Sequence, residues 1–229
     1  MREAIILAGG KGTRLNSVIC DLPKPMAPVD GRPFLEFILD RLIQFNFNSV
    51  ILSVGFKADK IISYFGDKYF DMPVKYMIER SPLGTGGAIK NCLNEISVDS
   101  AVVLNGDTYS DLNYDEMLDL NAKNRELVIG AIKVKDVNRY GALEVKSGNL
   151  IKFIEKGATG PGIINAGCYV INKNEFSNVL SEDNFSFEED YLKKIIKNRE
   201  IKVFISQGKF IDIGIPDDYF LAQNYLKGD

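Results

Sequence analysis

Apolar runs rich in β-branched residues alternate with amphipathic segments through the first half of the chain. The apolar runs predict strands at residues 3–8, 49–55, 74–79 and 100–107. Between them, the spacing of apolar positions predicts helices at residues 33–46, 57–66 and 84–96. This alternation is typical of a parallel sheet covered by helices on both faces. Right-handed crossovers would bring the carboxyl ends of its strands to one edge.

The second half of the chain is richer in strands, which short turns connect. Strands are predicted at residues 127–134, 141–145, 150–156, 164–173, 202–206 and 210–214. Ser186 and Glu189 have the spacing of a capping box at the start of a helix over 186–198, and a closing helix over 216–228 has proline in its first turn.

No repeat or linker interrupts the chain, so we expect a single domain over residues 1–229. The predicted fold is α/β and Rossmann-like, with a mixed, mainly parallel sheet flanked by helices. Its first half covers about residues 1–110, and a β-rich portion covers about residues 111–229.

Charge and cysteine content narrow the range of partners. The chain has 28 basic and 31 acidic residues, interspersed, for a net charge of -3. It lacks the basic patch of a nucleic-acid-binding protein, so we expect no nucleic-acid partner. There is neither an apolar run of transmembrane length nor a signal peptide, so we expect a cytoplasmic protein with no membrane partner. Cys20, Cys92 and Cys168 lie far apart and are expected to be reduced structural thiols.

The chain contains no histidine. This excludes a histidine general base, a Ser-His-Asp triad and the common zinc sites. Any chemistry must therefore depend on carboxylates, lysine and arginine, with or without a hard metal ion.

The stretch IILAGGKGTRL (residues 5–15) ends the first predicted strand in glycines and then presents an arginine. Such glycines let the backbone turn tightly and bring its N–H groups close to phosphate oxygens. The dinucleotide fingerprint GxGxxG is not met, because Leu15 stands where the third glycine would be, and no Walker A run occurs. The stretch is either a phosphate-binding loop with its own arginine or an ordinary tight turn with an exposed arginine.

The segments that follow this loop carry a specific resemblance. LAGGKGTRL followed by KPMAPVDGRPFLEFIL resembles the signature of the sugar-phosphate nucleotidyltransferases, which make NDP-sugars. Further parts of that pattern occur in order along nearly the whole chain: ERSPLGTGGAI, NGDTYSD, RYGALEV, FIEK, INAGCYVI and FIDIGIPDDY. The resemblance implies a nucleotide-binding first half and a sugar-phosphate-binding second half.

The implied reaction is attack of a sugar 1-phosphate oxygen on the α-phosphorus of a nucleoside triphosphate, with release of pyrophosphate. This nucleophile is already anionic near neutral pH, so the absence of histidine is no obstacle. The enzyme must hold two polyanions in line and neutralise the charge that develops. Arg14 and Lys24 are the predicted catalytic residues, and Pro23 and Pro25 hold Lys24 in a fixed position. The alternative for Lys24 is a solvated loop lysine.

Two aspartates are predicted to hold Mg²⁺, the cofactor that the resemblance implies. Asp107 ends the strand AVVLNGD, and Asp212 lies in the late strand FIDIG. Mg²⁺ favours one or two carboxylates together with phosphate and water oxygens. Taken alone, either aspartate could instead be a strand-end cap.

The resemblance also implies two sets of substrate contacts. The predicted nucleotide-binding residues are Leu7, Ala8, Gly9, Gly10, Gly12, Thr13, Glu79, Gly84 and Thr85. The predicted sugar-phosphate-binding residues are Gly141, Glu155, Lys156, Asn165 and Ala166. Asn165 has an alternative role in local turn chemistry.

Glu79 raises the question of which base is bound. A carboxylate there accepts both N1–H and N2–H₂ of guanine, a pattern that neither uracil nor thymine offers. The alternative is an ion pair with Arg80 or Lys75. Nearby, Gly84, Gly86 and Gly87 are expected to let the backbone approach the nucleotide at a helix N-terminus.

Among compact members of the family, the length and the stretch LGTGGAIKN are most similar to guanylyltransferases acting on a manno-configured heptose 1-phosphate. The expected substrates are therefore GTP and that sugar phosphate. Uridylyl-, thymidylyl- and mannose-1-phosphate guanylyltransferases of the same fold stay open. A non-catalytic nucleotide-binding regulator is a more remote alternative. The sequence is compatible with a homo-oligomer.

Overall fold

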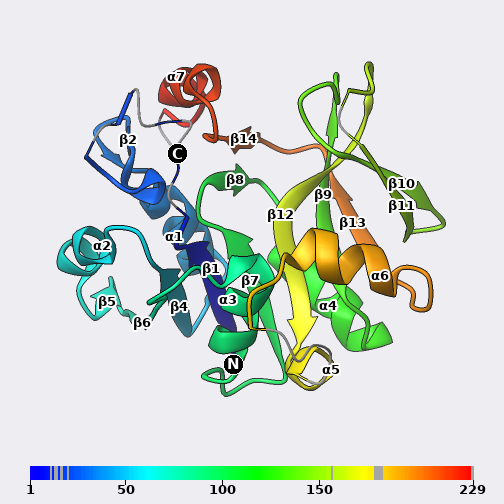
Figure 1. Cartoon of the computed structure of the whole chain (residues 1–229), viewed down its shortest axis with the longest axis horizontal. Coiled ribbons are helices and arrows are strands. Elements are labelled where there is room, and N and C mark those ends of the chain that lie inside the picture. The colour runs from blue at the N-terminus through cyan, green and yellow to red at the C-terminus, as the bar shows by residue number, and fades with distance from the viewer. Residues whose placement is uncertain are drawn as a thin grey trace.

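The centre of the protein is a ten-stranded sheet with the strand order β10-β11-β13-β9-β12-β7-β1-β4-β6-β5 (Figure 1). The computed structural model describes residues 1–10, 12, 15, 18–19, 21–155, 157–177 and 183–227. The strands of the sheet are β1 (Glu3–Ala8), β4 (Ser49–Val54), β5 (Lys68–Tyr69), β6 (Met72–Ile78), β7 (Ser100–Asn105), β9 (Val128–Val134), β10 (Ala142–Lys146), β11 (Asn149–Ile154), β12 (Gly162–Asn172) and β13 (Lys202–Ser206). Two small ladders join β2 (Pro28–Val29) to β3 (Arg32–Pro33) and β8 (Thr108–Ser110) to β14 (Phe210–Asp212).

The first half of the chain forms the predicted parallel sheet. Strand β1 pairs in parallel with β4 and β7, and β4 pairs in parallel with β6. Alternation along β1 places Ala4, Ile6 and Ala8 in one apolar cluster and Ile5 in the other. Each face of the sheet is therefore buried, and each fully buried isoleucine side chain contributes roughly 1.5–3 kcal/mol.

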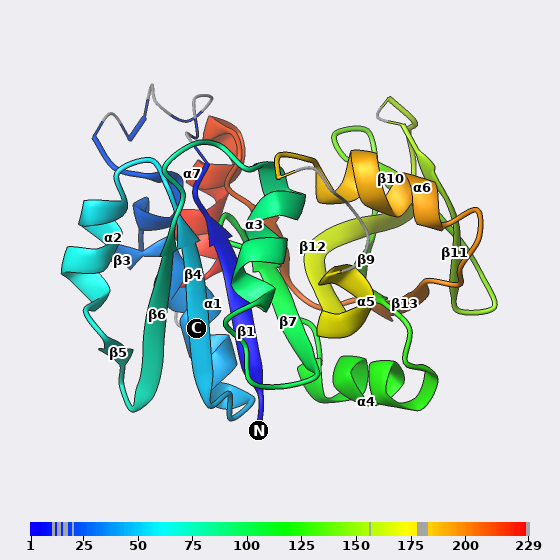
Figure 2. The same cartoon turned by 60° about the horizontal axis from the view of Figure 1, so that its bottom comes forward.

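Helices cover both faces of the sheet. The helices are α1 (Phe34–Gln44), α2 (Ala58–Phe65), α3 (Gly84–Leu93), α4 (Tyr114–Asn124), α5 (Lys173–Ser177), α6 (Lys193–Ile195) and α7 (Pro216–Tyr225). Side chains of α1, α2, α4 and α7 belong to the cluster that contains Ile6, whereas α3 and α5 contribute to the cluster that contains Ile5. Figure 2 shows α3 in front of β1 and β7. Within the described residues, no helix is both long and apolar enough to cross a membrane.

The second half makes the sheet mixed, as predicted. Strand β12 lies between β7 and β9 and is antiparallel to both, while β13 is parallel to β9. The hairpin β10–β11 extends the sheet beyond β13. Strand β12 thus joins the β-rich portion directly to the parallel sheet of the first half.

The predicted helix over residues 186–198 is correct in position but differs in form. Residues Phe187–Leu192 form a π-helix that continues into α6. The Ser186 hydroxyl accepts from the Glu189 N–H at 3.2 Å, as in a capping box. In return, the Ser186 N–H donates to the Asp190 carboxylate at 2.7 Å, whereas the capping-box pattern assigns this acceptor role to Glu189. The wider turn of a π-helix explains the one-residue difference.

Candidate active site

The glycine loop after β1 lines a cavity of about 810 Å³, here called the glycine-loop pocket. Parallel strands β1, β4 and β7 end at this edge of the sheet, where open α/β folds bind ligands. The pocket is lined by Leu7, Ala8, Gly9, Gly10, Gly12, Lys24, Pro25, Gly55, Phe56, Glu79, Arg80, Ser81, Pro82, Gly84, Thr85, Ala88, Asn105 and Asp107. All the predicted nucleotide-binding residues that the structure describes therefore line this one cavity. Thr13 and the predicted catalytic Arg14 lie outside the described residues.

Two glycines of the loop leave room for the functional side chains beside them. A Cβ on Gly9 would lie 2.5 Å from Oε1 of Glu79, and a Cβ on Gly12 would lie 3.2 Å from Cβ of Lys24. Gly12 also has a φ of +58°, which L side chains rarely adopt. The loop is therefore glycine-rich partly because Glu79 and Lys24 pack against it.

Glu79 lies at the end of β6, and its carboxylate is held by the protein. The Ser53 hydroxyl donates to Oε1 at 2.9 Å, and the Leu83 N–H approaches Oε2 at 3.4 Å. Within the described residues, no ion pair joins Glu79 to Arg80 or Lys75. The carboxylate thus faces the pocket, and no lysine or arginine of the described ranges forms an ion pair with it.

Lys24 bonds to one of the two predicted metal ligands. It begins a 3₁₀ turn after Pro23, and its Nζ lies 2.7 Å from Oδ2 of Asp107. Its side chain is only 11 % exposed, so Lys24 is not a solvated loop lysine. This position puts a fixed positive charge at the edge of the glycine-loop pocket.

The structure brings Asp107 and Asp212 together from distant parts of the chain. Asp107 follows β7 directly, and the β8–β14 ladder pairs Asp212 with Thr108. The pKa of Asp212 is raised to about 6, mainly by burial and secondly by the negative charge of Asp107. The Gly214 N–H donates to Oδ1 of Asp212 at 2.7 Å and opposes this rise.

This donor set fits a hard divalent cation. No group of three or more potential ligand side chains occurs within the described part of the chain, so the protein offers the two aspartates. Mg²⁺ commonly takes one or two carboxylates and completes its shell with phosphate and water oxygens. A cation here would also relieve the repulsion that raises the pKa of Asp212.

A second cavity of about 800 Å³, here called the bulge pocket, adjoins the first. It is lined by Asn105, Thr108, Asn138, Arg139, Tyr140, Gly141, Phe153, Ile154, Glu155, Asn165, Ala166, Gly167, Glu188, Glu189, Lys193, Phe210, Asp212, Gly214, Ile215 and Asp218. The predicted sugar-site residues Gly141, Glu155, Asn165 and Ala166 are all among them, and Lys156 lies outside the described residues. Asn105 lines both pockets, with Asp107 on the first and Asp212 on the second. The acidic pair therefore stands where the two pockets meet.

A β-bulge in β12 shapes the second pocket. The register with β9 shifts between Asn165 and Cys168, and Gly167 has a φ of +64°. Oδ1 of Asn165 accepts from the Gly167 N–H at 3.0 Å, and its Nδ2 donates to Tyr169 and Glu188, each at 2.8 Å. Asn165 thus stabilises the local turn, which was the alternative to a sugar-binding role. Its contact with a sugar stays a prediction.

Several residues of the site were not identified from the sequence. Arg139 forms an ion pair with Asp218 on the wall of the bulge pocket, although its motif RYGALEV belongs to the family pattern. Glu188 lines the same pocket and accepts from Tyr169 at 2.7 Å. Ser53 stands in the sequence only as part of a buried strand. The sequence feature that could have pointed to Ser53 is its polar side chain within an otherwise apolar run.

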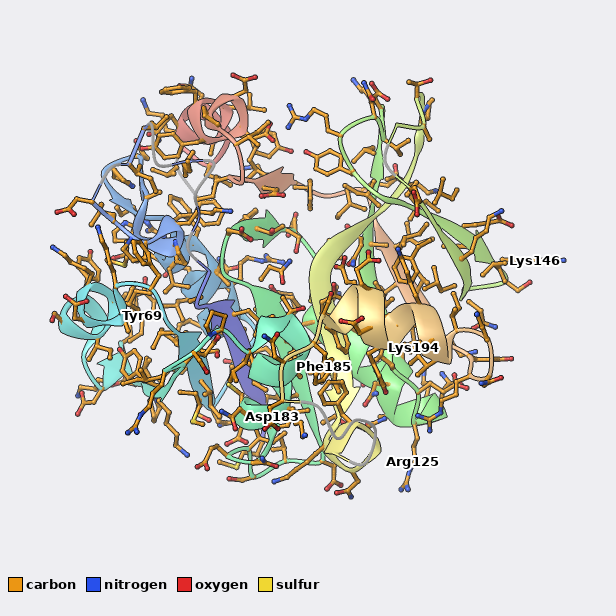
Figure 3. All side chains as sticks on the ribbon, viewed as in Figure 1. Tyr69, Arg125, Lys146, Asp183, Phe185 and Lys194 are labelled. Carbon is orange, nitrogen blue, oxygen red and sulfur yellow. The ribbon has the colours of Figure 1, made fainter. Side chains whose placement is uncertain are left out.

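The glycines at the start of α3 have a packing role that the sequence did not reveal. A Cβ on Gly86 would lie 2.0 Å from the Phe185 ring, and a Cβ on Gly87 would lie 2.1 Å from the Asp183 carbonyl oxygen. Figure 3 shows Phe185 and Asp183 beside α3. Gly86 and Gly87 pack closely against residues 183–185 and do not line the glycine-loop pocket, and their approach to a nucleotide stays a prediction. Gly84 also meets this segment, since a Cβ there would lie 2.4 Å from the Phe185 carbonyl oxygen, yet it lines the glycine-loop pocket as well.

Two adjoining pockets, with a lysine and two carboxylates at their junction, define a transferase site on a nucleotide-binding α/β fold. Such a site suits a reaction in which one phosphorylated substrate attacks another. The chain belongs to the nucleotidyl transferase family, whose sequence pattern matches residues 3–228. The membership inferred from the sequence motifs is thereby confirmed.

Individual relatives are similar over nearly their whole length. The D-glycero-alpha-D-manno-heptose 1-phosphate guanylyltransferase of Aneurinibacillus thermoaerophilus is 42% identical over 226 residues, covering 98% of each chain. The enzyme of the same name from Campylobacter jejuni is 42% identical over 95% of this chain and 97% of its own. The crystal structure of HddC from Yersinia pseudotuberculosis complexed with GMP-PN has a TM-score of 0.88 at 41% identity, covering 99% of this chain and 100% of that one.

Proposed function

We propose that this protein joins GTP and a manno-configured heptose 1-phosphate to give GDP-heptose and pyrophosphate. The observation that carries the proposal is the Glu79 carboxylate in the glycine-loop pocket, which also contains Lys24 and Asp107. A carboxylate accepts both N1–H and N2–H₂ of guanine, whereas uracil and thymine have one ring N–H between two carbonyls. The two relatives that are 42% identical carry the name of this activity.

In the proposed complex, GTP occupies the glycine-loop pocket and the sugar phosphate occupies the bulge pocket. The acidic pair then lies between the two substrates, close to where the new phosphate linkage forms. Mg²⁺ held by Asp107 and Asp212 would neutralise charge on the phosphate oxygens. Lys24 adds a fixed positive charge beside them, and we assign Arg14 to the triphosphate.

The remaining site residues bind and orient the sugar phosphate. Glu155 is assigned to sugar hydroxyls and Lys156 to the phosphate, with Gly141, Asn165 and Ala166 forming the surrounding wall. Because the attacking phosphate oxygen is anionic, no residue has to remove a proton from it. Catalysis then comes from alignment and from neutralisation of charge.

The test is pyrophosphate release with GTP, UTP, dTTP, CTP and ATP, each against sugar 1-phosphates that include manno-heptose and mannose. We expect release with GTP and manno-heptose 1-phosphate, abolished by EDTA and restored by excess Mg²⁺. The Arg14→Ala variant should lose this activity. Release with UTP or dTTP alone would overturn the guanine assignment, and preference for mannose 1-phosphate would overturn the heptose assignment.

A further inference from the structure

A buried serine lies behind the carboxylate that faces the glycine-loop pocket. Ser53 is the fifth residue of β4, where its neighbours Leu52 and Val54 are fully buried. The serine itself is 1% exposed, and its hydroxyl donates to Oε1 of Glu79 at 2.9 Å. Burial of a hydroxyl is unfavourable unless the group is hydrogen-bonded, so this bond accounts for a serine at that position.

The thiol of Cys92 lies beside the Ser53 hydroxyl. Burial raises the pKa of Cys92 to about 12, and its side chain is hydrogen-bonded to Ser53. The thiol is therefore neutral at physiological pH. A carboxylate can only accept hydrogen bonds, so the Ser53 hydrogen must point toward Glu79.

The same carboxylate oxygen is confined from its other side by the glycine loop. A Cβ on Gly9 would lie 2.5 Å from Oε1 of Glu79, so the backbone of the loop is close to this oxygen. Among the described residues, the other oxygen, Oε2, has a single hydrogen bond, the long contact of 3.4 Å to the Leu83 N–H. The orientation of the carboxylate thus depends mainly on Ser53 and Gly9. Each carboxylate oxygen keeps capacity to accept a further hydrogen bond from a ligand.

We propose that Ser53 is a positioning residue for base selection, because it orients the Glu79 carboxylate toward the N1–H and N2–H₂ edge of guanine. This inference rests on the proposed function, in which Glu79 contacts the base. Without the Ser53 bond, the carboxylate can rotate away from the plane of the base. Two parallel hydrogen bonds require both oxygens to lie near that plane.

The chain offers a matched control in the same strand. Ser49 is also buried, and its hydroxyl donates to Oε1 of Glu3 at 3.0 Å. The other oxygen of Glu3 accepts from the Ser97 N–H at 2.6 Å, and none of these three residues lines either substrate pocket. The variants Ser53→Ala and Ser49→Ala therefore remove equivalent serine–glutamate bonds, only one of which is at the site.

The experiment compares kcat/KM for GTP and ITP, with saturating sugar phosphate. Hypoxanthine keeps N1–H and lacks the 2-amino group, so the GTP/ITP ratio reports the contact to N2. Hydrogen bonds to a charged group correspond to a ratio of roughly 10 to 100 in the unmodified protein. We expect Ser53→Ala to lower this ratio by about 3- to 10-fold through KM for GTP, with kcat within about twofold. Ser49→Ala should leave the GTP/ITP ratio unchanged. Ser53→Thr keeps the hydroxyl and should also keep the ratio of the unmodified protein.

Glu79→Gln separates failure of this inference from failure of the proposed function. If Glu79→Gln abolishes the preference for GTP while Ser53→Ala behaves like Ser49→Ala, the role of Ser53 is wrong and the guanine assignment stands. If Glu79→Gln leaves the ratio intact, the guanine contact itself is wrong. Equal losses for GTP and ITP in Ser53→Ala would show a structural role only, which also overturns the inference. Should Ser53→Ala fail to fold, Ser53→Cys keeps the volume with a weak S–H donor and must lower the same ratio.

Discussion

Replacing Gly86 by alanine should destabilise the protein, although alanine is the better helix former. In α3, the change should by itself favour the helix by up to about 1 kcal/mol. However, the new Cβ would lie 2.0, 2.2 and 2.7 Å from three carbons of the Phe185 ring. Favourable carbon–carbon contacts are about 3.5–4.0 Å, so the ring or the helix must move by roughly 1.5 Å.

The surroundings of Phe185 decide the size of this effect. The ring is 4% exposed and packs in the cluster with Ile89, while its carbonyl accepts from the Gly86 N–H at 2.9 Å. Moving either part therefore disturbs both the packing and the hydrogen bond. Overpacking at the severe end of its usual range costs about 3 kcal/mol. After the gain in helix propensity, we expect the free energy of unfolding to fall by about 2 kcal/mol.

Urea unfolding, followed by circular dichroism, measures this change as a lower midpoint at constant m-value. Gly10→Ala is the control, because a Cβ there meets nothing within 4 Å, and its free energy of unfolding should change by less than about 0.5 kcal/mol. In a Phe185→Ala background, Gly86→Ala should become neutral or stabilising, which gives a coupling energy of about 2 kcal/mol. An unchanged or raised stability of Gly86→Ala alone would refute the steric argument.

Three further predictions follow from the site and the core. Lys24→Met should lower kcat by about 100-fold or more, because a fixed positive charge beside the phosphates is lost. The urea midpoint of unfolding should change little. Steady-state kinetics measures the first effect, and urea unfolding measures the second. Because burial and a second carboxylate raise the pKa of Asp212 to about 6, the metal-free protein should lose stability as pH rises from about 4 to 6. Urea unfolding across this range should show no such loss in Asp212→Asn, and a persistent loss would exclude Asp212 as its source. Burial raises the pKa of Cys92 to about 12 and that of Cys168 further, so Cys20→Ser should show no rapidly reacting thiol with Ellman's reagent until denaturant exposes two. Fast labelling of the folded variant would contradict the buried placement.

Much of the fold followed from local patterns. Apolar runs in the first half became parallel strands because a strand buried on both faces needs apolar residues at successive positions. Gly66 ends α2 with a φ of +61°, as its position after an amphipathic run predicts. The form of the helix over 186–198 was not predictable in the same way, because the π-helical turn depends on how Phe187 and Tyr191 pack into the core.

The candidate residues could be named from the sequence, but their arrangement could not. Motif order identified Asp107 and Asp212 as acids of interest, since each stands at the end of a strand. Their proximity depends on the β8–β14 ladder, a pairing between segments about a hundred residues apart. Such a pairing is set by the packing of the whole chain, and no local periodicity reports it.

The sequence by itself determined most strands of the central sheet, the family and the residue types available for chemistry, including the absence of histidine. These properties depend on neighbouring residues or on composition, so a linear pattern contains them. Only the tertiary structure decided that the Ser53 hydroxyl donates to Glu79 and that Gly86 packs against Phe185. Both contacts join residues from separate segments of the chain, and their existence depends on distances that the folded core alone establishes.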